Sequence, residues 1–119
     1  MDVKNALTGT QSKNKAQLIV DYIIEHPQAI DELMECFFHK EYRICQHAAW
    51  PLGMLGSRAP QLLKPYLKRM LSNLDHPHHD AVIRNTVRTL QFIEIPEELE
   101  GEVYEKCFVK ILQKGIGSF

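Results

Sequence analysis

One pattern of apolar residues occurs twice in this sequence, because residues 83–112 match residues 45–74 after a shift of 38 positions without a gap. The matched pairs are Cys45 with Ile83, Ala49 with Val87, Leu52 with Leu90, Leu55 with Ile93, Tyr66 with Tyr104, Met70 with Phe108, Leu71 with Val109 and Leu74 with Leu112. Within each copy these residues recur with helical spacing. A fixed repeat of this kind predicts stacked helical hairpins that bury their apolar faces against one another.

The composition is that of an ordinary globular domain. The chain has 119 residues, of which 45% are hydrophobic and 24% charged, and its formal net charge is −1. This predicts one domain without the bulk charge that attracts nucleic acid or an anionic membrane. No apolar run reaches the roughly 20 residues of a membrane helix, and residues 1–10 lack the apolar core of a secretory signal. We therefore expect a cytoplasmic protein, which also fits three cysteines without a Cys-x-x-Cys motif.

The repeat divides the chain into three pairs of helices, and nothing alternates with period two over a strand length. The expected parts are units over about 15–39, 42–74 and 80–113, a loose lead-in or cap over 1–14, and a short tail over 114–119. The first pair is a degenerate copy, as terminal repeats often are. The sequence thus predicts a single all-α domain of about six helices.

The two matched units resemble HEAT-type repeats, with paired helices, a period in the high thirties, small residues in the first helix and proline at the turn. The segments that carry the resemblance are 43–55 with 60–74 and 83–93 with 98–112, and the likeness is weaker over 16–38. The resemblance implies an armadillo-type α-solenoid of three antiparallel hairpins, wound as a right-handed superhelix. The chain departs from the pattern at Pro51, which removes a hydrogen bond to His47 and should kink the helix.

A histidine-rich turn is the most conspicuous polar cluster of the sequence. Its residues His76, His78, His79 and Asp80 could suggest a zinc or nickel site. Adjacent histidines in a loop do not converge easily on one ion, however. A polar turn that ends in Asp80 as a helix N-cap accounts for the same residues, so we expect no metal and no cofactor.

No catalytic constellation stands out in the sequence. Cys45 and His47 are two positions apart on one helix and therefore point in different directions. The glutamates between Glu97 and Glu105 fit the acidic start of a helix, which the helix dipole favours. The sequence therefore favours a noncatalytic protein.

A patch of aromatic and arginine residues lies outside the buried stripe of the two first helices. Stacking sets Trp50 beside Arg88 and Met54 beside Phe92, with Arg84 nearby. Tryptophan and arginine are common in the hot spots of protein interfaces, so this patch could bind a partner. Alternatively, these residues seal the groove between neighbouring repeats, with a cation–π contact between Trp50 and Arg88.

A basic strip is expected on the second helices, which usually line the inner surface of such solenoids. It consists of Lys64, Lys68, Arg69, Lys106 and Lys110, of which Lys68 and Lys106 coincide by the repeat. Such a strip could bind an acidic protein segment or a nucleic-acid backbone, or it could simply be a solvated helix face.

Three functions are compatible with these surfaces. The first is a noncatalytic interaction or scaffold module that grips a helix or a short acidic segment of another protein. The second is nucleic-acid binding, which the resemblance to HEAT-like proteins of DNA alkylation repair allows, although no catalytic residues of that family can be matched here. The third is a small accessory or regulatory subunit of an enzyme, which depends on the histidine turn alone.

Overall fold

The computed structural model describes residues 1–75 and 80–109. Within these residues the chain forms helices and no strand, which confirms the all-α prediction. The α-helices are α1 (Val3–Ala6), α2 (Lys13–Glu25), α3 (Ile30–Phe37), α4 (Tyr42–Arg58), α5 (Leu67–Asn73), α6 (Asp80–Leu90) and α7 (Glu100–Val103). Short 3₁₀ turns are found at Pro27–Ala29, Pro60–Leu62, Lys64–Tyr66 and Glu97–Leu99, and a π-helical turn at Tyr104–Val109.

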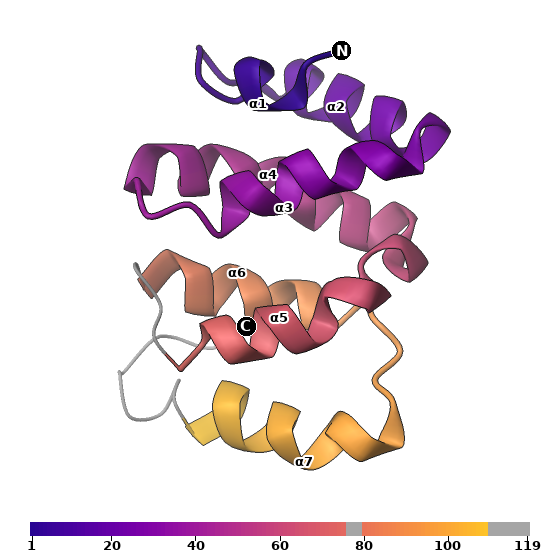
Figure 1. Cartoon of the computed structure of the whole chain (residues 1–119), viewed down its shortest axis with the longest axis vertical. Helices are drawn as coiled ribbons and strands as arrows, with labels where there is room; N and C mark the ends of the chain where they lie inside the picture. Colours follow the sequence, from indigo (N-terminus) through magenta and orange to yellow (C-terminus); the bar gives the residue numbers. More distant parts are fainter. Residues whose placement is uncertain (76–79, 110–119) are drawn as a thin grey trace.

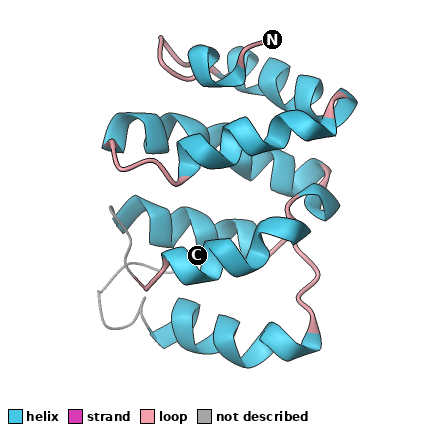
Figure 2. Ribbon diagram, in the orientation of Figure 1, coloured by secondary structure: helices cyan, strands magenta, loops and turns pink. Residues whose placement is uncertain are grey.

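The helices stack in pairs along the longest axis of the molecule (Figures 1 and 2). The extents of the molecule along its three principal axes are 37, 27 and 20 Å. The first helix of each pair contacts the next first helix, so that α2 packs on α4 and α4 packs on α6. In the view of Figure 1, α3 lies in front of α4 and α5 lies in front of α6. Helix α4 is the centre of the stack, because α2, α3 and α6 all pack against it.

One continuous apolar core runs through the stack, from Val3 in α1 to Leu99 before α7. The inward stripe of α4 includes Cys45, Leu52 and Leu55, all at most 1% exposed. These are the positions that the shift of 38 marks as equivalent to residues of α6. Helix α4 continues through Pro51, which is itself buried.

The N-terminal segment is more ordered than the loose lead-in of our prediction. Val3 and Leu7 are fully buried, because their spacing of four places both on the inner side of α1. The backbone N–H of Val3 donates to Oε2 of Glu32 at 2.9 Å, and Nδ1 of His47 lies 2.7 Å from the carbonyl oxygen of Leu7. Since a carbonyl only accepts, Nδ1 of His47 carries the proton. Helix α1 therefore packs against the first pair of helices at the end of the stack.

The second helix of the middle unit, α5, begins later than the apolar pattern suggests. Pro65 has no N–H to donate, and the chain passes through two 3₁₀ turns before α5 begins at Leu67. In the last unit, α7 is followed by the π-helical turn Tyr104–Val109, and the expected end of this helix near residue 113 lies outside the described residues. The apolar stripes recur through these breaks, because they follow the packing surface.

The equivalence of the two copies is incomplete at Tyr66 and Tyr104. Tyr66 is half-buried and its hydroxyl donates to the carboxylate of Asp31 on α3, whereas Tyr104 is 65% exposed. The residue 38 positions after Asp31 is Arg69, which offers no acceptor to Tyr104. Stacking thus preserves positions more strictly than it preserves polar contacts.

Candidate protein-interaction surface

An open groove of about 610 Å³ lies between α4 and α6. One stripe of each helix forms it. Helix α4 contributes Gln46, Ala49, Trp50, Gly53, Met54 and Ser57, and α6 with the turn after it contributes Asn85, Arg88, Thr89 and Phe92. Because both stripes follow the helical repeat, the groove runs along the two helices, which lie next to each other.

Large apolar side chains line this groove and remain accessible. Trp50 is 46% exposed and Phe92 is 45% exposed, while Met54 is half-buried. Single exposed apolar residues are common on proteins, but three of them around one groove form a contiguous apolar surface. The groove therefore offers an apolar contact area that no described part of the chain covers.

Two glycines of α4 give the groove its shape. A Cβ atom added at Gly56 would lie 3.2 Å from Cγ2 of Thr89 and 3.6 Å from Cδ2 of Phe92, so Gly56 permits the close approach of α6. A Cβ atom added at Gly53 would meet nothing within 4 Å. The helices are thus in contact beside Gly56, and a hollow remains beside Gly53.

The two helices that form the groove carry an excess of arginine. Helix α4 contains no Asp or Glu, and the only acidic residue of α6 is Asp80, its first residue. Arg84 and Arg88 are exposed, lie one turn apart on α6, and form no ion pair with any described residue. Arg58 at the end of α4 is paired with Asp21 at 2.6 Å. The groove therefore combines exposed apolar side chains with Arg88, and its lining contains no carboxylate.

Four of the five residues of the predicted aromatic and arginine patch line this groove, namely Trp50, Met54, Arg88 and Phe92. Arg84 lies one turn before Arg88, outside the lining. Trp50 and Arg88 make no cation–π contact with each other; among the described residues, such a contact joins Arg69 and Phe38. The lining residues that we did not predict are Gln46, Ala49, Gly53, Ser57, Asn85 and Thr89. Helical spacing from Trp50 and Arg88 could have identified these residues, since they lie on the same stripes of α4 and α6.

The sequence profile of the HEAT repeat domain family matches residues 3–116, almost the whole chain. The chain belongs to this family. No curated protein and no solved structure matches the chain. Among the described residues, no helix is long and apolar enough to cross a membrane.

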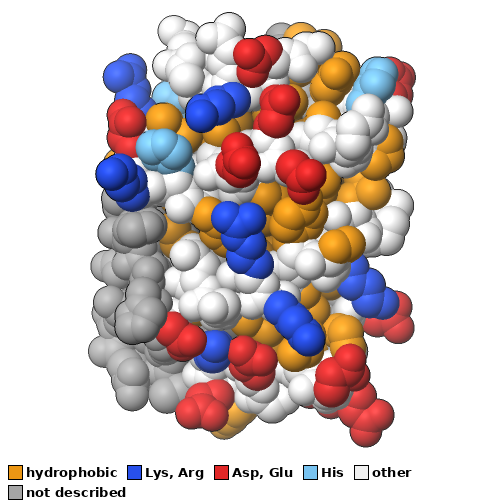
Figure 3. Space-filling model, in the orientation of Figure 1, with side chains coloured by type: hydrophobic (Ala, Val, Ile, Leu, Met, Phe, Trp, Pro, Cys, Tyr) orange, Lys and Arg blue, Asp and Glu red, His pale blue; other side chains and the backbone are white. Residues whose placement is uncertain are grey.

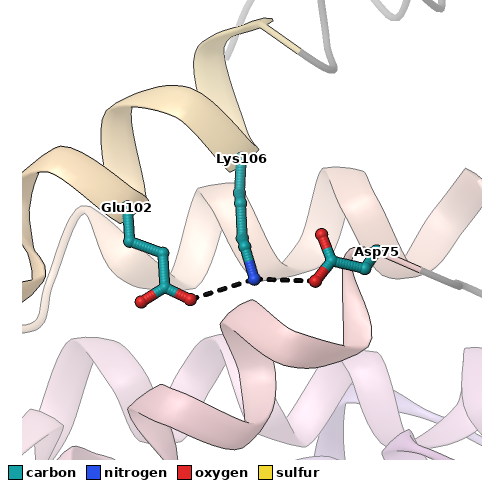
Figure 4. A network of polar contacts seen from close by, with 3 residues as sticks. All are labelled: Asp75, Glu102 and Lys106. Carbon is teal, nitrogen blue, oxygen red and sulfur yellow. Dashed lines mark hydrogen bonds and ion pairs between the residues drawn. The ribbon is translucent and has the colours of Figure 1, made fainter.

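The second helices of this HEAT repeat protein carry the basic residues expected there, but acidic residues accompany them. Nζ of Lys106 lies 2.8 Å from Oδ2 of Asp75 and 2.9 Å from Oε1 of Glu102 (Figure 4). These two hydrogen bonds raise the pKa of Lys106, the bond to Asp75 most of all. The positive charge of Lys106 is therefore balanced within the molecule.

The other residues of the strip lie in different surroundings. The guanidinium of Arg69 lies 4.5 Å from the ring centroid of Phe38, and Nζ of Lys64 lies 3.9 Å from Oε2 of Glu94. Lys68 is exposed, and Lys110 lies outside the described residues. Acidic and basic side chains alternate over the face of α3, α5 and α7 shown in Figure 3. This face therefore has mixed charge where the sequence suggested a basic one.

The remaining groups with possible chemical reactivity are the histidine turn and the buried thiol of Cys45. His76, His78 and His79 lie outside the described residues, and Asp80 begins α6. Within the described residues no group of three metal-ligand side chains converges. Cys45 is 1% exposed, and burial raises the pKa of its thiol to about 11. The Cys45 thiol is thus a neutral part of the core at physiological pH.

Proposed function

We propose that this HEAT repeat protein is a noncatalytic interaction module that binds a short segment of another protein in the groove between α4 and α6. HEAT repeat domains act in general as protein-interaction scaffolds, and the groove supplies a specific surface for that role. The observation that carries the proposal is the presence of Trp50, Met54 and Phe92, all at least partly accessible, around one hollow beside Arg88.

The composition of the groove supports binding to protein. Aromatic and arginine side chains supply much of the binding free energy at protein interfaces, and methionine adapts to irregular apolar partners. A stretch of about 16 Å along α4, from Gln46 to Ser57, suits a short segment rather than a whole domain. The basic strip contributes less to this proposal, because Lys106 and Lys64 already have carboxylate partners.

Capture of partners from cells that express the tagged protein tests this proposal. The double variant Trp50→Ala, Phe92→Ala removes the two exposed aromatic side chains of the groove. The control Leu18→Ala, Tyr104→Ala removes two other exposed apolar side chains, which are 60% and 65% exposed and lie outside the groove. We expect a partner that is retained by the wild type and the control and lost by the groove variant. Equal retention by all three proteins would contradict the proposal.

Nucleic-acid binding is the competing function, since arginines beside an exposed tryptophan can also bind a single strand by stacking. Binding of a labelled oligonucleotide that weakens steeply with added salt and requires Trp50 would favour it. Met54 favours a protein segment, because a thioether offers a base no aromatic ring for stacking and offers a phosphate no charge.

A further inference from the structure

We infer that the segment bound between α4 and α6 is an amphipathic α-helix that carries acidic residues, and that one of its apolar side chains enters the hollow beside Gly53. The inference rests on the proposed function and narrows it to one class of partner. It follows from three properties of the groove, namely its walls, its charge and its hollow.

The walls favour a helix over an extended segment. Both walls are α-helices, whose backbone groups are already paired, and no described strand offers an edge to which a peptide could add. An extended peptide would need about five residues to cover 16 Å, and the polar lining residues Gln46, Ser57 and Asn85 could pair with only some of its N–H and C=O groups. A helix of about three turns covers the same length and satisfies its own backbone groups. A helix is therefore the segment that the groove can bind with the fewest unpaired backbone groups.

The charge of the groove selects an acidic helix. Helix α4 has no carboxylate along its 17 residues, and α6 has none after Asp80. Arg88 in the lining and Arg84 one turn before it have no ion-pair partner among the described residues. Arg43 is exposed one turn before Gln46 and adds to the cations at that end of the groove. A carboxylate on the bound helix would meet these arginines, whereas a lysine would be repelled.

The hollow beside Gly53 provides the place for an apolar anchor. The absence of a side chain there leaves open space in the lining of the groove, one turn along α4 from Trp50 and next to Met54 in the sequence. A helix places anchors at positions i, i+3 or i+4, and i+7, so one anchor can enter the hollow while the next contacts Phe92. Gly53 is therefore a specificity-determining residue in this inference, since any side chain at that position would occupy the space of the anchor.

Selection from a phage-displayed library of random 16-residue peptides tests the inference without presuming the answer. We expect the enriched peptides to show apolar residues at helical spacing together with Asp or Glu, and synthetic copies to lose at least about tenfold in affinity when a central residue is replaced by proline. The double variant Arg84→Glu, Arg88→Glu should bind these peptides with an affinity lower by about tenfold or more. Selection against this variant should enrich peptides that carry lysine instead.

The Gly53 hollow is tested with a pair of glycine variants. A Cβ atom added at Gly53 or at Gly101 meets nothing within 4 Å, and both glycines lie in helices, so both variants should fold. We expect Gly53→Met to weaken the selected peptides by about tenfold or more, and Gly101→Met in α7 to leave their affinity unchanged. Far-UV circular dichroism of both variants verifies the fold.

Several results would overturn the inference. These are enriched peptides with proline or with a two-residue apolar period, enriched peptides rich in lysine or arginine, no enrichment at all, unchanged affinity in Gly53→Met, or displacement of the peptides by a 20-nucleotide oligothymidine. The proposed function has its own separate outcome. A natural partner that depends on Trp50 and Phe92 but binds through an extended or basic segment would uphold the function and refute the helix.

Discussion

The face formed by the second helices and the face formed by the first helices differ in whether their basic residues have acidic partners. On the second helices, Lys106 is bonded to two carboxylates and Lys64 lies near Glu94. On the first helices, Arg84 and Arg88 have no such partner among the described residues, and exposed aromatic rings lie beside them. Because a charge that is already paired gains little from a new partner, the two faces differ in what they can bind. The comparison teaches that a basic residue in a repeat indicates a binding surface only where the fold leaves it unpaired.

The largest effect that separates the two faces should be on binding. The double variant Trp50→Ala, Phe92→Ala should weaken the captured partner by at least about 100-fold, or about 3 kcal/mol, because buried aromatic anchors dominate such interfaces. The matched variant Lys64→Ala, Lys68→Ala on the other face should change affinity less than about threefold. Isothermal titration calorimetry measures both. If the lysine variant lost more affinity than the aromatic variant, the partner would bind the face of the second helices and not the groove.

The stacking of helices, and with it the residues that become neighbours across α4 and α6, could be predicted from the sequence. A shift of 38 positions and the helical repeat together place Trp50 next to Arg88 and Met54 next to Phe92, and all four line the groove. These neighbours follow from periodicity alone, since each lies at a fixed angle on its helix. The open hollow between them could not be predicted, because it depends on how far apart two helices settle at Gly53 and Gly56.

Contacts that begin in turns or at the chain end were also beyond periodicity. The basic strip was expected from Lys68 and Lys106, yet Lys106 is paired with Asp75, which follows α5 in the turn between units. No repeat fixes where a turn residue points. Likewise, only Val3 and Leu7 mark α1 as part of the core, and two apolar residues are too few to define a helical period. The sequence therefore specifies the interior of the stack better than its edges.

A second effect concerns the buried side of α4, opposite the groove. Burial raises the pKa of the Cys45 thiol to about 11, from an ordinary value of 9.0. Above pH 9 the unfolded chain releases this proton while the folded chain retains it. The stability that Cys45 contributes is therefore present below pH 9 and lost as the pH rises towards 11. The free energy of unfolding of the wild type, relative to Cys45→Ala, should fall by about 2 kcal/mol over this range.

Urea denaturation of both proteins between pH 8 and 11 measures this difference. Cys36, whose pKa is also raised chiefly by burial, is present in both proteins and cancels. A difference that stays constant with pH would contradict the raised pKa of Cys45 and the burial that causes it.

A third effect tests whether the second-helix face is held by its own ion pairs. The variant Lys106→Met should lower the free energy of unfolding by about 1 kcal/mol, since it removes two partly exposed ion pairs and the link between Asp75 and Glu102. The contacts raise the pKa of Lys106 above 10.5, so this contribution is complete below that pH and is lost as the pH rises through the higher value in the folded chain.

Thermal denaturation at low and high salt measures the contribution of Lys106. The wild type should approach the variant as salt is added, because salt screens partly exposed charges. Lys68→Met is the control, since its side chain is exposed and equivalent by the repeat. Equal stability of Lys106→Met and the wild type would leave the strip free for a partner and would weaken the contrast between the two faces.

The smallest effect compares the open and closed parts of the α4–α6 contact. Gly53→Ala should raise the free energy of unfolding by about 0.5 to 1 kcal/mol, because alanine favours the helix and its Cβ atom meets nothing within 4 Å. Gly101→Ala should show a similar gain for the same reason. Gly56→Ala should show no gain or a loss, since its Cβ atom would lie 3.2 Å from Cγ2 of Thr89, closer than ordinary van der Waals contact. Chemical denaturation resolves these differences when the three variants are measured side by side. A gain at Gly56 equal to that at Gly53 would mean that α6 is not in close contact with α4 beside Gly56. The groove would then not have the shape on which the binding of a helix was inferred.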